Sequence, residues 1–164
     1  MVILQAETEP QIAEARTLFR EYEAWLGIDL CFQGFEEELS RLPGKYAPPD
    51  GRLFLAYSDE GLAGCIAMRK LGDGVCEMKR LFVRDAFRGR RIGNELIQKI
   101  IEAARDADYS KMRLDTYPAK MGKAADLYRS YGFYEIAPYY NNPDEGVLFM
   151  ELDLADHSSE PNVV

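Results

Sequence analysis

The chain has 164 residues, 47% of them hydrophobic, which is typical of one packed domain. Its formal net charge of −8 argues against general binding to nucleic acid or to an anionic membrane. The chain also lacks an apolar run of about 18 residues, the length that a membrane-spanning helix needs. From the charge and the missing apolar run together, we expect neither a nucleic-acid partner nor a membrane partner.

Cysteine and histidine usage narrows the chemistry further. The three cysteines (Cys31, Cys65 and Cys76) form no CxxC pair, and the one histidine, His157, lies in a polar tail. This pattern predicts no disulfide framework and no metal site, and it favours a reducing, cytoplasmic location. It also leaves no histidine to activate a serine or cysteine nucleophile.

The first half of the chain predicts two helices. Thr8 is a candidate cap for a helix whose apolar residues recur at helical spacing, which are Ile12, Ala15, Leu18, Phe19, Tyr22 and Trp25. A second, short helix is expected over residues 35–42, ended by Pro43 and Gly44. A loop rich in proline and glycine follows.

The rest of the chain alternates strands and helices. Three strand-like runs (52–58, 62–71 and 75–84) are separated by short turns typical of hairpins. A helix from residue 92, a strand over 111–117, a helix over 122–131 and two final strands follow. The order ααβββαβαββ predicts an α+β fold, with a mixed, mostly antiparallel sheet and helices on both faces. We expect one domain over residues 1–154 and a flexible tail over 155–164.

A basic turn stands out on this acidic chain. Six basic residues fall between positions 79 and 91, and "RGRRIG" (88–93) opens a helix. A helix N-terminus offers unpaired N–H groups and a positive dipole end, so basic side chains there are unfavourable unless an anion offsets them. The turn therefore predicts a phosphate-binding site.

The strand before this turn breaks the alternation of apolar residues. Leu81, Phe82 and Val83 are consecutive apolar residues. Either the strand is buried on both faces, or it contains a β-bulge near residues 80–82. The pattern alone leaves both readings open.

Two segments resemble the motifs of a known family. "LFVRDAFRGRRIGNELI" looks like motif A of the GNAT N-acetyltransferase superfamily, and "AADLYRSYGF" looks like its motif B. The resemblance covers nearly the whole chain and implies an acyltransferase that uses acetyl-CoA, with no metal. It implies that the cofactor is bound by the strand and the turn, through Leu81, Phe82, Val83, Arg88, Gly89, Arg90, Arg91, Ile92, Gly93 and Asn94, and by Tyr128.

The sequence departs from the family pattern at two positions. Arg91 stands where the motif usually has its middle glycine, so its side chain is expected to point away from the pyrophosphate. Met121 stands where many members carry an asparagine, which removes one side-chain contact.

The resemblance also implies catalytic roles. Tyr128 is the candidate acid for the leaving thiolate, and Glu77 is the candidate base, with Asp115 as a weaker competitor. The alternative for Glu77 is an ion pair with Lys79 or Arg80. A backbone amide of Phe82 or Val83 is expected to stabilise the oxyanion.

The acceptor is predicted to be a primary amine of a small or amino-acid-like molecule, acetylated directly in a ternary complex. Phe32, Phe35, Tyr139 and Tyr140 are candidate walls of its site, with Glu36 or Asp29 attracting an ammonium group. The alternatives are protein or peptide N-acetylation, and a CoA-binding sensor without turnover. A homodimer is compatible with the final strands.

Overall fold

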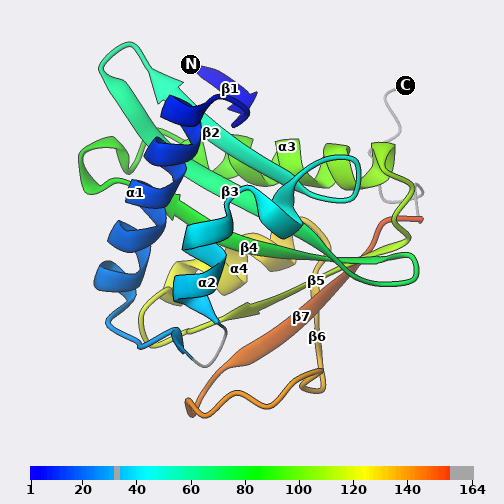
Figure 1. Cartoon of the computed structure of the whole chain (residues 1–164). Helices are drawn as coiled ribbons and strands as arrows, with labels where there is room; N and C mark the ends of the chain where they lie inside the picture. The colour runs from blue at the N-terminus through cyan, green and yellow to red at the C-terminus, as the bar shows by residue number, and fades with distance from the viewer. Residues whose placement is uncertain (32–33, 156–164) are drawn as a thin grey trace, which may run out of the picture.

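The computed structural model describes residues 1–31 and 34–155. In this part of the chain, seven strands form one sheet in the order β1-β2-β3-β4-β5-β7-β6, and four α-helices pack against it (Figure 1). The elements are β1 (Val2–Gln5), α1 (Glu9–Leu26), α2 (Phe35–Arg41), β2 (Arg52–Ser58), β3 (Gly61–Gly72), β4 (Val75–Val83), α3 (Ile92–Asp106), β5 (Lys111–Thr116), α4 (Gly122–Ser130), β6 (Tyr134–Ile136) and β7 (Leu148–Asp153).

The α+β fold class and the mixed sheet are confirmed. Strands β4 and β5 are parallel, and the other neighbouring pairs of the described sheet are antiparallel. The predicted order ααβββαβαββ lacked the first strand, however. Strand β1 has four residues and pairs with β2, Val2 lying opposite Tyr57. Such a short run carries no readable period, and its pairing partner lies about 50 residues further along the chain.

Helices cover both faces of the sheet, as predicted. Figure 1 shows α1 and α2 on one face and α3 and α4 on the other. The buried residues form two clusters accordingly, one beneath α1 and α2 and one beneath α3 and α4. Thr8 caps α1 through a capping box with Gln11, and Gly27 ends the helix in the left-handed conformation. Trp25, predicted to lie on the buried stripe of α1, is 38% exposed.

Strand β4 contains the bulge that the sequence left as one of two alternatives. Phe82 lies opposite Cys65 and Lys79 lies opposite Ala67, so β4 has one more residue than β3 over this stretch. Arg80 adopts the left-handed conformation there, with φ of 62°. Gly64 permits the close approach of the two strands, because a Cβ atom on it would lie 2.5 Å from the carbonyl oxygen of Phe82.

On its other edge, β4 pairs with β5 over only part of its length. The β4–β5 pairing spans only Val75–Glu77 and Lys111–Arg113, although β4 continues to Val83 and β5 to Thr116. The two strands therefore diverge just before the bulge. The candidate site described below lies at this divergence, beside the start of α3.

Candidate active site

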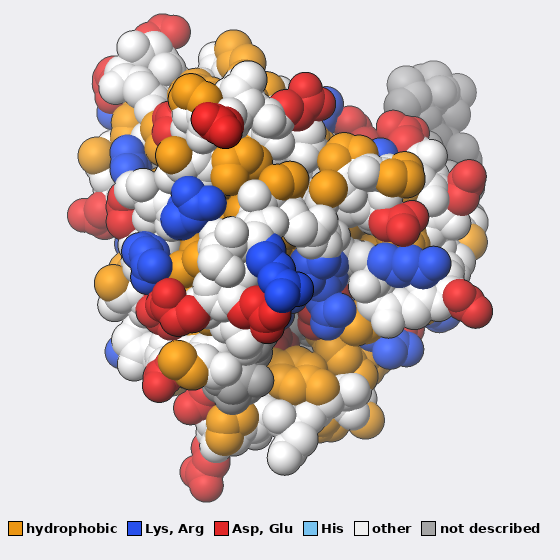
Figure 2. Space-filling view, in the orientation of Figure 1, with side chains coloured by type: hydrophobic (Ala, Val, Ile, Leu, Met, Phe, Trp, Pro, Cys, Tyr) orange, Lys and Arg blue, Asp and Glu red, His pale blue; other side chains and the backbone are white. Residues whose placement is uncertain are grey.

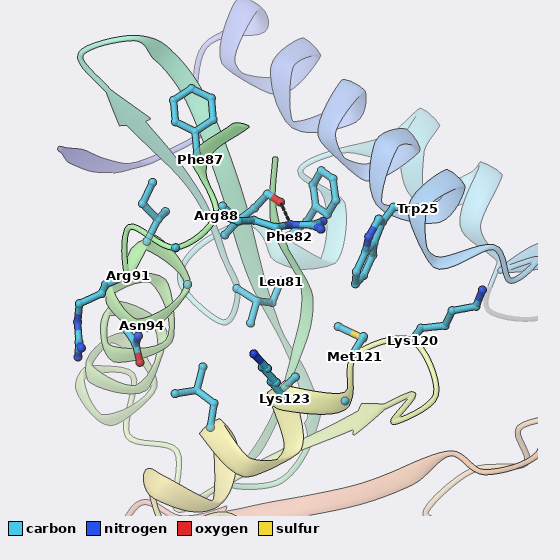
Figure 3. A pocket seen from close by; sticks show the side chains of 17 residues that line it. Trp25, Leu81, Phe82, Phe87, Arg88, Arg91, Asn94, Lys120, Met121 and Lys123 are labelled. Carbon is cyan, nitrogen blue, oxygen red and sulfur yellow. Dashed lines mark hydrogen bonds between the residues drawn. The ribbon is translucent and has the colours of Figure 1, made fainter. Parts of the chain in front are cut away.

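A cleft of about 600 Å³ lies where β4 leads into α3 (Figure 3). The end of β4, the loop before α3, the first turn of α3 and the start of α4 form its walls, and Trp25 of α1 closes one side. The described lining residues are Trp25, Leu81, Phe82, Val83, Phe87, Arg88, Gly89, Arg91, Ile92, Gly93, Asn94, Lys120, Met121, Gly122, Lys123, Ala124 and Leu127.

The cleft is positively charged. Its described lining includes Arg88, Arg91, Lys120 and Lys123 but no carboxylate. In Figure 3, Lys123 points into the cleft toward Leu81, whereas Lys120 points outward past Trp25. Arg88 is held on the wall, since its Nε donates to the carbonyl of Val83 at 3.1 Å and its guanidinium lies 4.8 Å from the Trp25 ring centre.

The first turn of α3 faces this cleft. Gly89 and Arg91 both have positive φ, 81° and 63°, and Arg91 occupies the N-cap position. No side chain caps the helix, so its first N–H groups are available to a ligand. The turn thus combines free amides, the helix dipole and nearby cations. Arg91, the irregular residue of the motif, takes up a backbone conformation in which glycine would be unstrained.

Most of the predicted cofactor-binding residues meet in this cleft. Of the predicted residues, only Arg90 and Tyr128 are absent from the described lining of the cleft. The Arg90 side chain pairs with Glu60 at 3.0 Å and lies over the Phe87 ring instead. Sequence reasoning missed Trp25, Lys120 and Lys123 as cleft residues. Lys120 precedes α4 and Lys123 lies in its first turn, and only the tertiary fold brings them beside α3.

Tyr128 lies on the buried side of α4. It is 3% exposed and packs against Phe133, with ring centres 5.7 Å apart. Burial raises the pKa of Tyr128, so the hydroxyl keeps its proton in neutral solution. That hydroxyl has no hydrogen-bond partner among the described residues. The hydroxyl is a proton donor at neutral pH, and its role as the acid stays a prediction.

Glu77 lies on the other side of the bulge, and it is only 1% exposed. Its carboxylate accepts from Arg69 Nε at 2.8 Å and from the Tyr139 hydroxyl at 2.6 Å, with Lys79 Nζ 3.8 Å away. Burial raises its pKa, but Lys79, Arg69 and the Tyr139 hydrogen bond outweigh burial and leave it lowered. Glu77 is therefore ionised at neutral pH. Of the two partners expected in the alternative role, Lys79 pairs with Glu77 and Arg80 pairs with Glu38 instead. The nearest partner of Glu77 is Arg69, which the sequence did not indicate.

The predicted acceptor residues are only partly brought together. Tyr139 and Tyr140 line a second cavity of about 210 Å³ beside Glu77 and Lys79. Phe35 is fully buried under the Arg80 guanidinium, and Phe32 lies outside the described residues. Glu36 pairs with Arg20 at the surface.

The cysteines offer no competing chemistry. Cys65 and Cys76 are fully buried, and burial raises the pKa of Cys76 to about 12. Within residues 1–31 and 34–155, no group of three or more His, Cys, Asp or Glu side chains could hold a metal ion. No described helix is long and apolar enough to cross a membrane.

This chain is similar in sequence to known proteins over most of its length. Residues 13–133 match the model of the acetyltransferase (GNAT) family. An uncharacterized N-acetyltransferase of Schizosaccharomyces pombe is 38% identical, over 94% of this chain and 96% of its own length. Another, of Dictyostelium discoideum, is 34% identical over 94% of this chain and 100% of its own length.

The fold is shared with solved structures as well. A GNAT-family acetyltransferase of Staphylococcus aureus has a TM-score of 0.76 at 20% identity, covering 93% of this chain and 98% of that one. The chain belongs to the GNAT acetyltransferase family, whose members transfer an acetyl group from acetyl-CoA.

Proposed function

We propose that this acetyltransferase transfers the acetyl group directly to the primary amine of a small molecule, with both substrates bound together. One observation carries the proposal. A cationic cleft of about 600 Å³ and a polar, tyrosine-lined cavity of about 210 Å³ lie on either side of one bulge in β4. The smaller cavity matches a small molecule better than a folded protein surface.

The residues of the cleft fit acetyl-CoA. The Lys123 side chain, the Arg91 backbone N–H and the first N–H groups of α3 would hold the pyrophosphate, and the cofactor supplies the activated thioester when it is bound. The Arg91 side chain itself points away from the cleft in Figure 3, as expected from the sequence. The pantetheine arm would lie along β4, on the side where β5 has diverged. The apolar walls at Leu81, Ile92 and Leu127 suit its carbon chain.

The backbone N–H groups of β4 that face the gap left by β5 can be identified from the pairing of β4 with β3. Arg84 N–H donates to Ala63 of β3 at 2.8 Å, so the N–H of the preceding residue, Val83, points to the opposite side. By the same alternation Leu81 faces the gap and Phe82 does not. The sequence suggested the backbone amide of Phe82 or of Val83. We therefore assign oxyanion stabilisation to the backbone N–H groups that face the gap, those of Val83 and Leu81.

The chemistry then follows from the residues around the gap. The amine must lose a proton. Glu77, which lies beside the cavity proposed to hold the amine, takes this proton directly or through a water molecule. As the new C–N bond forms and the C–S bond breaks, the leaving thiolate takes a proton, and Tyr128 is the candidate donor. The buried, histidine-free surroundings of Cys65 and Cys76 favour this direct route over an acetyl-cysteine intermediate.

Replacing Glu77 with glutamine tests the base. We expect kcat/KM to fall by roughly 100-fold or more, because general bases contribute about 10²–10⁴-fold. The matched control is Glu151→Gln, since Glu151 is also a largely buried sheet carboxylate, bonded to Arg113 at 2.9 Å. The measurement is the pH–rate profile of kcat/KM for both variants. An unaltered profile for Glu77→Gln would show that Glu77 only orders Arg69 and Tyr139.

The function itself is tested by CoA release with a panel of amines. Saturable release that depends on an amine supports the proposal. Acetylation of peptides alone would favour the protein-modifying alternative, and binding of acetyl-CoA without turnover would favour a sensor.

A further inference from the structure

The cavity beside Glu77 has a distinct chemical character. Its lining includes two tyrosine rings, three cations and a single carboxylate, which are Tyr139, Tyr140, Lys45, Arg69, Lys79 and Glu77. In the view of Figure 2, Lys and Arg side chains gather near the middle of the molecule, with Asp and Glu side chains beside them and a hydrophobic patch below. The protein as a whole is strongly acidic, so a local excess of positive charge calls for a cause.

The surrounding charges do not cancel this excess. Glu38 is bonded by Arg80 and lies 3.2 Å from Lys45, and Asp115 accepts from the Tyr140 hydroxyl. With these included, four cations (Lys45, Arg69, Lys79 and Arg80) face three carboxylates (Glu38, Glu77 and Asp115). The described residues around the cavity therefore carry one net positive charge.

Among the three cations that line the cavity, Lys79 is the most withdrawn from water. Its side chain is 7% exposed, and its ammonium forms an ion pair with Glu77 at 3.8 Å. Burial, with Arg80 beside it, lowers the pKa of Lys79 to about 8. A buried ammonium is stabilised strongly by an anionic partner, because the low local dielectric strengthens the attraction.

Lys79 is also close to the reaction centre. It precedes the bulge residue Arg80, and Leu81, on the far side of the bulge, already lines the cofactor cleft. Two residues of chain span at most roughly 7 Å, and the left-handed Arg80 between them shortens that distance. A small acceptor bound at Lys79 thus has its other end within a few bonds of the gap between β4 and β5.

We propose that the acceptor is a small amine that also carries a carboxylate, bound by the Lys79 ammonium with Arg69 nearby and enclosed by the rings of Tyr139 and Tyr140. One net positive charge matches a monoanion such as a carboxylate better than a phosphate dianion. The inference rests on the proposed function and specifies its substrate class. It differs from the expectation that Glu36 or Asp29 attracts the acceptor's ammonium, because here the acceptor is recognised through its carboxylate.

Matched acceptors test the inference on the wild-type enzyme. Each amino acid is compared with its carboxamide and with the amine that lacks the carboxyl group, at saturating acetyl-CoA. We expect kcat/KM for the acid to exceed that for the amide by roughly 10–100-fold, the value of a charge-assisted hydrogen bond. Equal values for acid and amide would overturn the inference and leave the proposed function standing. No turnover with any amine would overturn both.

Variants assign the effect to Lys79. Lys79→Met should raise KM for the acid roughly 10–100-fold more than KM for the amide, and Lys79→Arg should keep part of the preference. Any loss that reaches catalysis through Glu77, the ion-pair partner of Lys79, should affect acid and amide equally and cancels in this ratio. Lys70→Met, an exposed lysine of β3, is the control and should alter neither. Unchanged acetyl-CoA affinity shows that the variants are folded. An acid-to-amide ratio of kcat/KM in Lys79→Met equal to that of the wild type would contradict carboxylate binding by Lys79.

Discussion

Replacing Gly93 with aspartate is expected to abolish most acetyl-CoA binding while leaving the protein folded. Gly93 lies in the first turn of α3, and a Cβ atom there would meet only Val83 Cγ2, at an ordinary 3.9 Å. A carboxylate near a helix N-terminus stabilises the helix by about 0.3–1 kcal/mol. The same carboxylate would lie where we place the pyrophosphate, and two like charges 4 Å apart near a protein surface repel by about 4 kcal/mol.

We therefore expect the Kd for acetyl-CoA to rise by roughly 100-fold or more, since about 1.4 kcal/mol corresponds to tenfold. Isothermal titration gives the Kd, and thermal unfolding should show an equal or slightly higher Tm. Gly93→Asn is the control, because asparagine has nearly the same size but no charge, and it should weaken binding only a few-fold. If the aspartate and asparagine variants bind alike, the pyrophosphate does not lie at this turn.

The second large effect is expected at Glu38, whose side chain is 3% exposed. It accepts from Arg80 through both oxygens, at 2.9 and 3.1 Å, and Arg80 is itself 4% exposed. Removing one partner of a buried ion pair leaves the other uncompensated, which costs about 3–5 kcal/mol. Glu38→Ala should lower the free energy of unfolding by that amount in urea denaturation. Because Arg80 holds the bulge, activity should fall as well.

The effect should depend on pH in a defined direction. Burial raises the pKa of Glu38, but Arg80 outweighs burial and lowers it from 4.5 to about 2. A lowered folded-state pKa stabilises the protein fully above the unfolded value, near pH 4.5, and this contribution is lost as the pH falls through about 2. The stability difference between wild type and Glu38→Ala should therefore shrink between pH 4.5 and 2.

Two variants control for this prediction. Glu36→Ala removes a carboxylate from the same helix that pairs with Arg20 at the surface, and it should cost less than about 1 kcal/mol. The double variant Glu38→Leu with Arg80→Met replaces the pair by apolar side chains and should recover most of the loss. A Glu38→Ala protein within about 1 kcal/mol of wild type would show that the pair contributes little.

Local patterns predicted most of the fold and the basic turn at the start of α3. The helical stripe of α1, the three-stranded meander and the basic turn before α3 are each encoded within about 20 residues. The break in alternation at Leu81–Val83 indicated the bulge as one of two explanations. Four residues of β1 carried too little pattern to predict a strand, since their pairing with β2 depends on the finished sheet.

Side-chain partners that are distant in sequence were not predictable. Arg80 was one of two possible partners for Glu77, but it pairs with Glu38, 42 residues away, and Glu77 pairs with Arg69 of the neighbouring strand. Trp25 fits the apolar stripe of α1, yet it lies at the mouth of the cleft against Arg88. These positions depend on how the helices pack on the sheet, and spacing along one element does not encode that packing.

The most direct test of the account is to follow an isotopically labelled acetyl group from acetyl-CoA in the presence of the amine panel. Mass spectrometry identifies the product, and thiol release counts the CoA formed. We predict that the label is found on the nitrogen of a small amine, with one CoA released per product molecule. Label that stays on the protein, or CoA release without any acetylated amine, would contradict direct transfer to a small acceptor.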